Sequence, residues 1–422
     1  MKNDNVENTE VSAYAAFGYR DFRLLIIGQF IVSLGGQMLS FAIGWELWLR
    51  THDAFALGLV GLVQVIPVLL FSLPAGHVAD HYNRKNIIFA MQILFAICSF
   101  SLALISLFDG PIVLIYLCLL GIGIAHAFNN PAASTLLPQT VPPHVFTSAA
   151  TWSSSAWQFA SVVGPALAGL LIALWNKAVV IYIFDGLSAI VLLVLVGMIK
   201  GRELALAAKN TTTLESLAAG LKFILNTRVI FAAITLDMFA VLLGGAVSLL
   251  PIYATDILKV GPEGLGIMRA APSIGALVMA VIISQFQPFK QAGKILLWSV
   301  AGFGLATIIF GLSTSFWLSV AMLFLLGGLD NISVVIRSTL MLTLTPDEMR
   351  GRASAVNNIF IGTSNELGGF ESGLAARLFG PIIAVVGGGI GTILVVLATA
   401  KIWPELTNLK TLDAPDPEQA PS

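Results

Sequence analysis

The segment that decides the fold lies at residues 179–199 and reads VVIYIFDGLSAIVLLVLVGMI, an apolar run with one charged residue, Asp185. A helix rises about 1.5 Å per residue, so about 20 apolar residues cross the hydrocarbon core of a bilayer. The run has this length, and its Val, Ile and Leu side chains leave no polar face for water. We therefore predict that it crosses a membrane as a helix.

Comparable apolar runs extend along the chain in both directions, separated by short segments that contain Gly, Pro and Asp. We expect twelve spans, near residues 22–48, 56–79, 87–107, 111–136, 146–174, 179–199, 228–253, 264–286, 295–312, 316–344, 353–378 and 381–402. The predicted fold class is an all-α polytopic membrane protein with twelve transmembrane helices.

The composition agrees with this prediction. The 422 residues are 57% hydrophobic and only 11% charged, whereas a soluble domain has about 25% charged residues. The mean hydropathy is +0.89. These values exclude a soluble enzyme, and 22 basic against 23 acidic residues give no field that would attract a nucleic acid. Long unbroken apolar runs also exclude a transmembrane β-barrel, whose strands alternate.

The basic residues predict the orientation, because loops rich in Lys and Arg stay in the cytoplasm. With a cytoplasmic N-terminus, sixteen of them lie inside and three, Arg50, Lys177 and Lys259, lie outside. We therefore expect a multi-pass protein of the cell (inner or plasma) membrane with both termini in the cytoplasm.

A weak internal repeat divides the chain into two halves. Sliding the sequence by 204 residues lays 135–169 over 339–373 without a gap and with six identities. Both copies cover the fourth and fifth spans of a six-span half. Parallel repeats of this kind are typical of transporters, whose substrate site lies between the halves near the bilayer midplane.

The repeat gives the predicted domain organisation. We expect a cytoplasmic N-terminal tail at 1–20, a six-helix half at 21–200, a cytoplasmic linker at 201–227, a second six-helix half at 228–403 and a disordered cytoplasmic tail at 404–422. In the linker, Thr212 and Glu215 have the spacing of a capping box, which predicts an amphipathic helix there.

The loop between spans two and three reads GHVADHYNRK at residues 76–85. It resembles the cytoplasmic signature loop of the major facilitator superfamily, G-x-x-x-D-R/K-x-G-R-R/K, through four matching positions: Gly76, Asp80, Arg84 and Lys85. His81 and Asn83 depart from the pattern. Because Asn tolerates the left-handed conformation, we expect the turn to survive at Asn83.

The resemblance implies that this loop is a gate. Asp80 would face the N-terminus of span eleven, near Ala353, where the helix dipole favours a carboxylate. The alternative is that Asp80, Arg84 and Lys85 are solvated charges that only set the topology.

Span five contains a second motif. Gly164, Pro165 and Gly169 resemble the core of the antiporter motif of drug-exporting facilitators, G-P-x-x-G-G, with Ala168 in place of one glycine. The alternative is ordinary packing of small residues between helices.

A wider similarity covers almost the whole chain, including 19–23, 237–258, 345–353 and 364–368. These segments are similar to the enterobactin-exporter and macrolide-efflux branch of the superfamily. The resemblance implies two pseudo-symmetric halves, export of siderophores, macrolides or other drugs, and proton antiport.

Ionisable residues within the spans are the candidate functional residues, because a charge at mid-bilayer costs at least ~2.5–3.5 kcal/mol and usually faces a cavity or a partner. A coupling carboxyl must also take up and release a proton, and burial away from water favours its neutral form. Asp237 and Asp330 fit best, since both lie well inside their spans. The candidates for proton coupling or the substrate cavity are Asp237, Asp330, Arg337, Glu366 and Glu46.

Some of these candidates have structural alternatives. Arg337 lies two turns from Asp330, so we expect it to pair with a neighbouring span through Glu366 or Asp237. Glu46 can form a local ion pair with Arg50. Asp185 is expected only to cap or anchor its helix.

The leading hypothesis is a secondary active exporter that works by alternating access, coupled to protons, with an amphipathic small molecule as substrate. An importer or facilitator of a small metabolite is the nearest alternative, and an intramembrane enzyme or a transporter-derived sensor is a remote one. No Walker, His-Glu-x-x-His or Gly-x-Ser-x-Gly motif is present in the sequence. We expect no enzymatic activity, no cofactor, no metal, no nucleic-acid partner and a monomer in the lipid bilayer.

Overall fold

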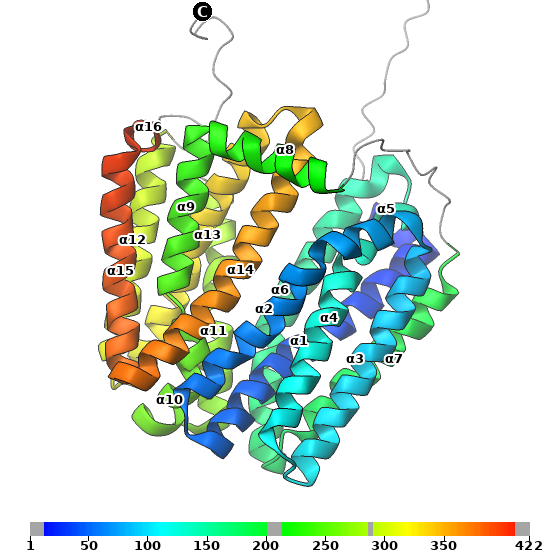
Figure 1. Cartoon of the computed structure of the whole chain (residues 1–422), viewed down its shortest axis with the longest axis horizontal. Helices are drawn as coiled ribbons and strands as arrows, with labels where there is room; N and C mark the ends of the chain where they lie inside the picture. Colours follow the sequence, from blue (N-terminus) through cyan, green and yellow to red (C-terminus); the bar gives the residue numbers. More distant parts are fainter. Residues whose placement is uncertain (1–11, 201–212, 286–289, 410–422) are drawn as a thin grey trace, which may run out of the picture.

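The computed structural model of the chain describes residues 12–200, 213–285 and 290–409, without the side chains of residues 73, 77, 80, 213 and 214. All regular structure in these ranges is helical. Two helix bundles stand side by side, as Figure 1 shows. The first holds α1 (Arg20–Thr51), α2 (Ala54–His81), α3 (Arg84–Leu107), α4 (Ile112–Ser134), α6 (Phe146–Trp175) and α7 (Val179–Met198).

The second bundle is built in the same way from the rest of the chain. It holds α9 (Arg228–Leu243), α11 (Gly261–Gln285), α12 (Ala292–Leu312), α13 (Phe316–Leu344), α14 (Asp347–Phe379) and α15 (Pro381–Ile402). A helix therefore lies in each of the twelve predicted ranges, and in eleven of them it is one long helix. Eleven helical segments of the described chain are long and apolar enough to cross a membrane. Helix α14 has the length, 33 residues, but carries more polar side chains. The predicted all-α polytopic fold is confirmed.

One span is not the uninterrupted helix that we predicted at 228–253. Helix α9 ends at Leu243, and Gly244 and Gly245 interrupt it. The chain continues through η3 (Ala246–Leu249), α10 (Leu250–Ile252) and a π-helical turn, η4 (Tyr253–Ile257). The break needs glycine, because a Cβ on Gly245 would lie 2.5 Å from the carbonyl oxygen of Gly368 in α14.

Asn83 differs from its expected conformation. Its φ of −63° and ψ of 115° are extended, and its side-chain oxygen accepts a hydrogen bond of 3.0 Å from the Lys85 N–H. The turn therefore survives because Asn83 caps the N-terminus of α3, and no left-handed residue is required there.

The described residues directly after 403 are more ordered than we predicted. The tail expected at 404–422 begins with a short helix, α16 (Pro404–Thr407), so the prediction of disorder is wrong for these residues. Proline suits the first helical position, and the Leu406 side chain is fully buried against α12. Near the other end, the Ala13 carbonyl accepts a hydrogen bond of 2.9 Å from the Trp152 indole N–H of α6. The short helix η1 (Ala15–Gly18) follows it.

Helix α8 (Thr213–Asn226) lies in the predicted linker, at the same end of the molecule as α16 (Figure 1). Thr212 of the predicted capping box lies outside the described residues. Helix α8 packs closely on α14, since a Cβ on Gly220 would lie 2.7 Å from the carbonyl oxygen of Arg352.

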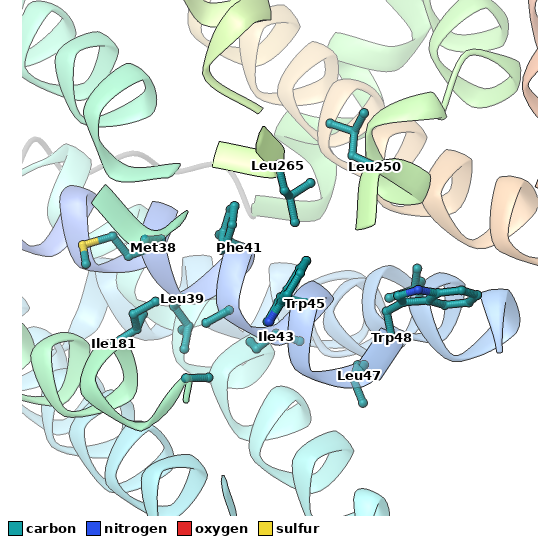
Figure 2. Close-up of a cluster of buried hydrophobic side chains, with 14 of the residues drawn as sticks. Met38, Leu39, Phe41, Ile43, Trp45, Leu47, Trp48, Ile181, Leu250 and Leu265 are labelled. Atoms are coloured by element: carbon teal, nitrogen blue, oxygen red, sulfur yellow. The ribbon is translucent and has the colours of Figure 1, made fainter. Parts of the chain in front are cut away.

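The largest apolar core continues from one bundle into the other. Figure 2 shows Phe41 and Trp45 of α1 near Leu265 of α11, with Leu250 of α10 close by. The two halves are therefore packed together at the end of the molecule where α10 lies.

Candidate functional site

A cavity of about 650 Å³ lies between the two bundles. The first bundle contributes α1, α2 and α6 to its wall, and the second contributes α9, η3, α11, α12, α13 and α14. Most of the wall is apolar. Its polar and charged side chains are Ser40, Gln64, Trp157, Gln158, Ser248, Arg269, Ser273, Asp330, Asn331, Asn365 and Glu366. A mostly apolar chamber with a few polar groups suits an amphipathic small molecule.

Arg269 connects the two bundles across this cavity. Its guanidinium donates a hydrogen bond of 3.0 Å to the Ser40 hydroxyl oxygen of α1. It also interacts electrostatically with Glu366 of α14, another residue of the wall. The predicted candidate Glu366 therefore faces a basic residue that was not among our candidates.

Asp237 and Arg337 form a buried ion pair inside the second bundle. The carboxylate of Asp237 lies 2.6 Å from a guanidinium nitrogen of Arg337, and the two residues are 5% and 6% exposed. The Arg337 Nε–H donates a further hydrogen bond of 3.2 Å to the Ser333 hydroxyl oxygen. Of the two partners expected for Arg337, the structure places Asp237 beside it.

Asp330 occupies a wall shared by two spaces. It lines the large cavity, and with Asp237, Ser333 and Phe303 it lines a much smaller pocket of about 10 Å³ behind it. That is near the least volume that can hold a water molecule. Asp330, together with Val241 and Phe303, thus lines both the large cavity and the pocket that Asp237 reaches.

Glu46 does not line this cavity, because its side chain is bonded to Tyr182 of α7 and to Arg50. Its carboxylate is 3.3 Å from Arg50 and accepts a hydrogen bond of 2.8 Å from the Tyr182 hydroxyl. The local Glu46–Arg50 pair is thereby confirmed. Asp185 is also an anchor, as expected, since it accepts a hydrogen bond of 2.5 Å from the Ser99 hydroxyl.

The antiporter-like motif joins α6 to both bundles. A Cβ on Gly164 would lie 2.6 Å from the Cβ of Gln37 in α1, within the first bundle. A Cβ on Gly169 would lie 2.5 Å from the carbonyl oxygen of Pro262 and 3.1 Å from the Cα of Gly266, both in α11 of the second bundle. Pro165 is buried between them in α6. The last glycine of the motif therefore lets the halves touch.

The halves meet again on the other side of the cavity, between α2 and α14. A Cβ on Gly58 would lie 3.1 Å from the Cα of Gly373. Nearby, Arg377 of α14 lies 3.5 Å from Asp53 and stacks over the Phe55 ring at 5.2 Å from its centroid.

Together these contacts close one end of the molecule. The Trp48 indole N–H adds a hydrogen bond of 2.7 Å to the Thr255 hydroxyl oxygen across the halves. In Figure 1 the bundles converge at this end, where α10 lies, and diverge toward α8.

The signature loop lies at the diverging end. Gly76 and Asp80 belong to the last turns of α2, and the side chain of Asp80 falls outside the described residues, so its predicted gate contact stays a prediction. Arg84 begins α3, and the Lys85 ammonium donates to the carbonyl oxygen of Ile199, the residue that directly follows α7. Lys85 is thus held within the first bundle.

Several residues of the cavity wall were not predicted from the sequence. Arg269 is the most important, and its sequence signal is a basic residue inside an apolar span. Trp157 and Gln158 also line the cavity. Trp45 is buried in the apolar core, and the Trp152 indole holds the N-terminal segment.

Comparison with known proteins places these features in a family. The sequence model of the family described as transmembrane secretion effector, a major facilitator family, matches residues 11–420. The enterobactin exporter EntS of Citrobacter koseri is 26% identical over 409 residues, which cover 95% of each chain. Macrolide efflux protein A of Streptococcus pyogenes is 23% identical over 297 residues, which cover 69% of this chain and 73% of the relative.

Solved structures share the fold. A bacterial homologue of the lysosomal transporter Spinster, in an inward-facing and occupied conformation, superposes with a TM-score of 0.72 at 14% identity, covering 92% of this chain and 97% of that one. The nucleoside transporter NupG gives a TM-score of 0.70 at 15% identity, with 91% and 99% covered.

Proposed function

The chain belongs to the major facilitator superfamily, in its transmembrane secretion effector family, and on that basis we propose that it is a proton-coupled exporter of an amphipathic small molecule. It is a multi-pass membrane transporter, and its relatives are efflux proteins rather than enzymes. The observation that carries the proposal is the cavity between the halves, which is closed at one end and has Asp330 and Glu366 in its wall.

The proposed cycle follows from the contacts between the halves. We assign the closed end, with Trp48 and Arg377, to the outer side of the membrane and the end with α8 to the cytoplasm, in line with the distribution of basic residues. The structure then corresponds to the state that receives cargo from the cytoplasm. Breaking the outer contacts and closing the α8 end would release it outside.

We further propose that the protein works as a monomer in the inner membrane, with protons moving inward as cargo moves outward. Asp330 and Glu366 are the candidate proton carriers because both line the cavity. We assign the Asp237–Arg337 pair to the support of this wall, since each member already satisfies the other.

Proton coupling can be tested with purified protein in liposomes. With an acidic lumen, efflux of protons should drive accumulation of a macrolide or of enterobactin, the cargoes named for the relatives. An ionophore that collapses the pH gradient should abolish accumulation, and so should Asp330→Asn. The Asp185→Asn variant is the matched control, because it removes a carboxylate outside the cavity. Movement that ignores the gradient would instead indicate a facilitator.

The gate function of Asp80 predicts a separate effect. Asp80→Asn should lower the transport rate by about ten-fold, because a carboxylate facing a helix N-terminus contributes up to ~2 kcal/mol to the closed cytoplasmic end. The amount of protein in the membrane should stay unchanged on an immunoblot. An unchanged rate would show that Asp80 only sets topology. The Arg84→Gln variant tests that alternative, because it removes a charge from the same loop.

A further inference from the structure

The acidic groups around the cavity outnumber the basic groups. The wall and the small pocket hold three carboxylates, Asp237, Asp330 and Glu366, and one guanidinium group, Arg269. A second guanidinium, that of Arg337, lies next to the small pocket, where it pairs with Asp237. Arg337 is bonded to Asp237, and Arg269 interacts with Glu366. One carboxylate, Asp330, has no basic group of its own.

Among the residues that the structure describes, the carboxylate of Asp330 makes no hydrogen bond and no ion pair. Arg337 is close enough to interact with it electrostatically. The charged groups on the neighbouring elements are Asp237 of α9, Arg269 of α11, Arg337 of α13 itself and Glu366 of α14. Helix α12 brings the Phe303 ring to the same two spaces.

The break after α9 adds negative potential to this region. The C-terminal end of a helix carries about half a negative charge. Helix α9 ends at Leu243, and Val241, Gly244 and Gly245 around that end line the cavity. Both the unpaired carboxylate and the helix end therefore favour a positive charge in the cavity.

An anionic cargo is disfavoured by the same contacts. It would need Arg269, whose guanidinium is already held by Ser40 and faces Glu366. It would also meet Asp330 and the end of α9 without a compensating cation.

We propose that the cargo carries a positively charged centre, such as an alkylated amine, and that this centre binds at Asp330 beside the Phe303 ring. A cation over an aromatic face gains about 0.5–2 kcal/mol, in addition to its attraction to the carboxylate. The cargo cation and a proton then compete for one carboxylate, which gives exchange without a second coupling site. This inference rests on the proposed export function and specifies the chemical class of its cargo.

Two probes of the same shape and opposite charge test the proposal: tetraphenylphosphonium and tetraphenylborate. Binding of each to the purified, detergent-solubilised protein is measured by equilibrium dialysis. The cation should bind at least about ten-fold more tightly than the anion. Asp330→Asn should weaken cation binding by about ten-fold or more, whereas Asp185→Asn should leave it unchanged.

Proton release gives a second readout that a change of shape alone would not produce. In weakly buffered solution near the midpoint of the carboxyl titration, cation binding should release protons, and Asp330→Asn should suppress the release. Asp185→Asn, which removes a carboxylate outside the cavity, should retain it.

The outcomes separate this proposal from the export function. Preferential binding of tetraphenylborate, lost in Arg269→Gln, would overturn the cationic class while gradient-driven transport in liposomes could still stand. Cation binding that is equal in Asp330→Asn, or that releases no proton, would overturn the shared site. Cation binding with proton release, but without transport driven by the gradient, would keep this site and reject the exporter.

Discussion

The Arg337→Met variant should lose about 3–5 kcal/mol of stability, because it leaves the buried Asp237 carboxylate without its ion-pair partner. The two charged atoms lie 2.6 Å apart within the second bundle, where little water can replace the lost guanidinium. Thermal unfolding of the detergent-solubilised protein, together with its yield from the membrane, measures the effect.

Two controls distinguish this mechanism from a general loss of packing. The double variant Asp237→Leu with Arg337→Met should recover much of the stability, because both charges are then absent. Arg228→Met removes the 3.0 Å pair between Arg228 and Glu405, whose side chains are 77% and 41% exposed. Screening by solvent should leave the stability of this variant close to that of the unchanged protein. If Arg337→Met and Arg228→Met are equally stable, burial does not determine how much the Asp237–Arg337 pair contributes to stability.

The span positions could be predicted because hydrophobicity is local. Helix α7 occupies Val179–Met198 within the run at 179–199, and α6 occupies Phe146–Trp175 around the run at 146–174. The break at Gly244 was missed because it depends on distant residues. Gly368 of α14 gives the broken segment its close contact, and no local pattern around Gly244 contains that information.

The candidate site was predicted in part for the same reason. A charge inside a span signals a partner or a cavity, so Asp330 and Glu366 could be selected from sequence, and both line the cavity. Which residue pairs with which depends on how the helices are rotated. Sequence reasoning thus left Arg337 with two possible partners and included Glu46, which the structure pairs with Arg50 and Tyr182.

Gly169→Leu should hold the transporter open at the end that the structure shows closed. A Cβ at this position would lie 2.5 Å from the Pro262 carbonyl oxygen, and a backbone group cannot turn aside as a side chain can. Overpacking of this kind costs about 1–3 kcal/mol. The cost falls only on the closed state, so it shifts the populations by roughly 5- to 150-fold. Transport should fall accordingly, because alternating access needs both states.

Cysteine labelling distinguishes this shift from simple misfolding. With Cys98 and Cys118 replaced by alanine, Ser248→Cys places one thiol in the cavity wall. A membrane-impermeant maleimide added to intact cells should label this thiol slowly when Gly169 is present. It should label the thiol much faster in the Gly169→Leu variant. Gly387→Leu is the matched control, since a Cβ there meets no atom within 4 Å. Slow labelling and normal transport with Gly169→Leu would mean that the α6–α11 contact does not control the outer closure.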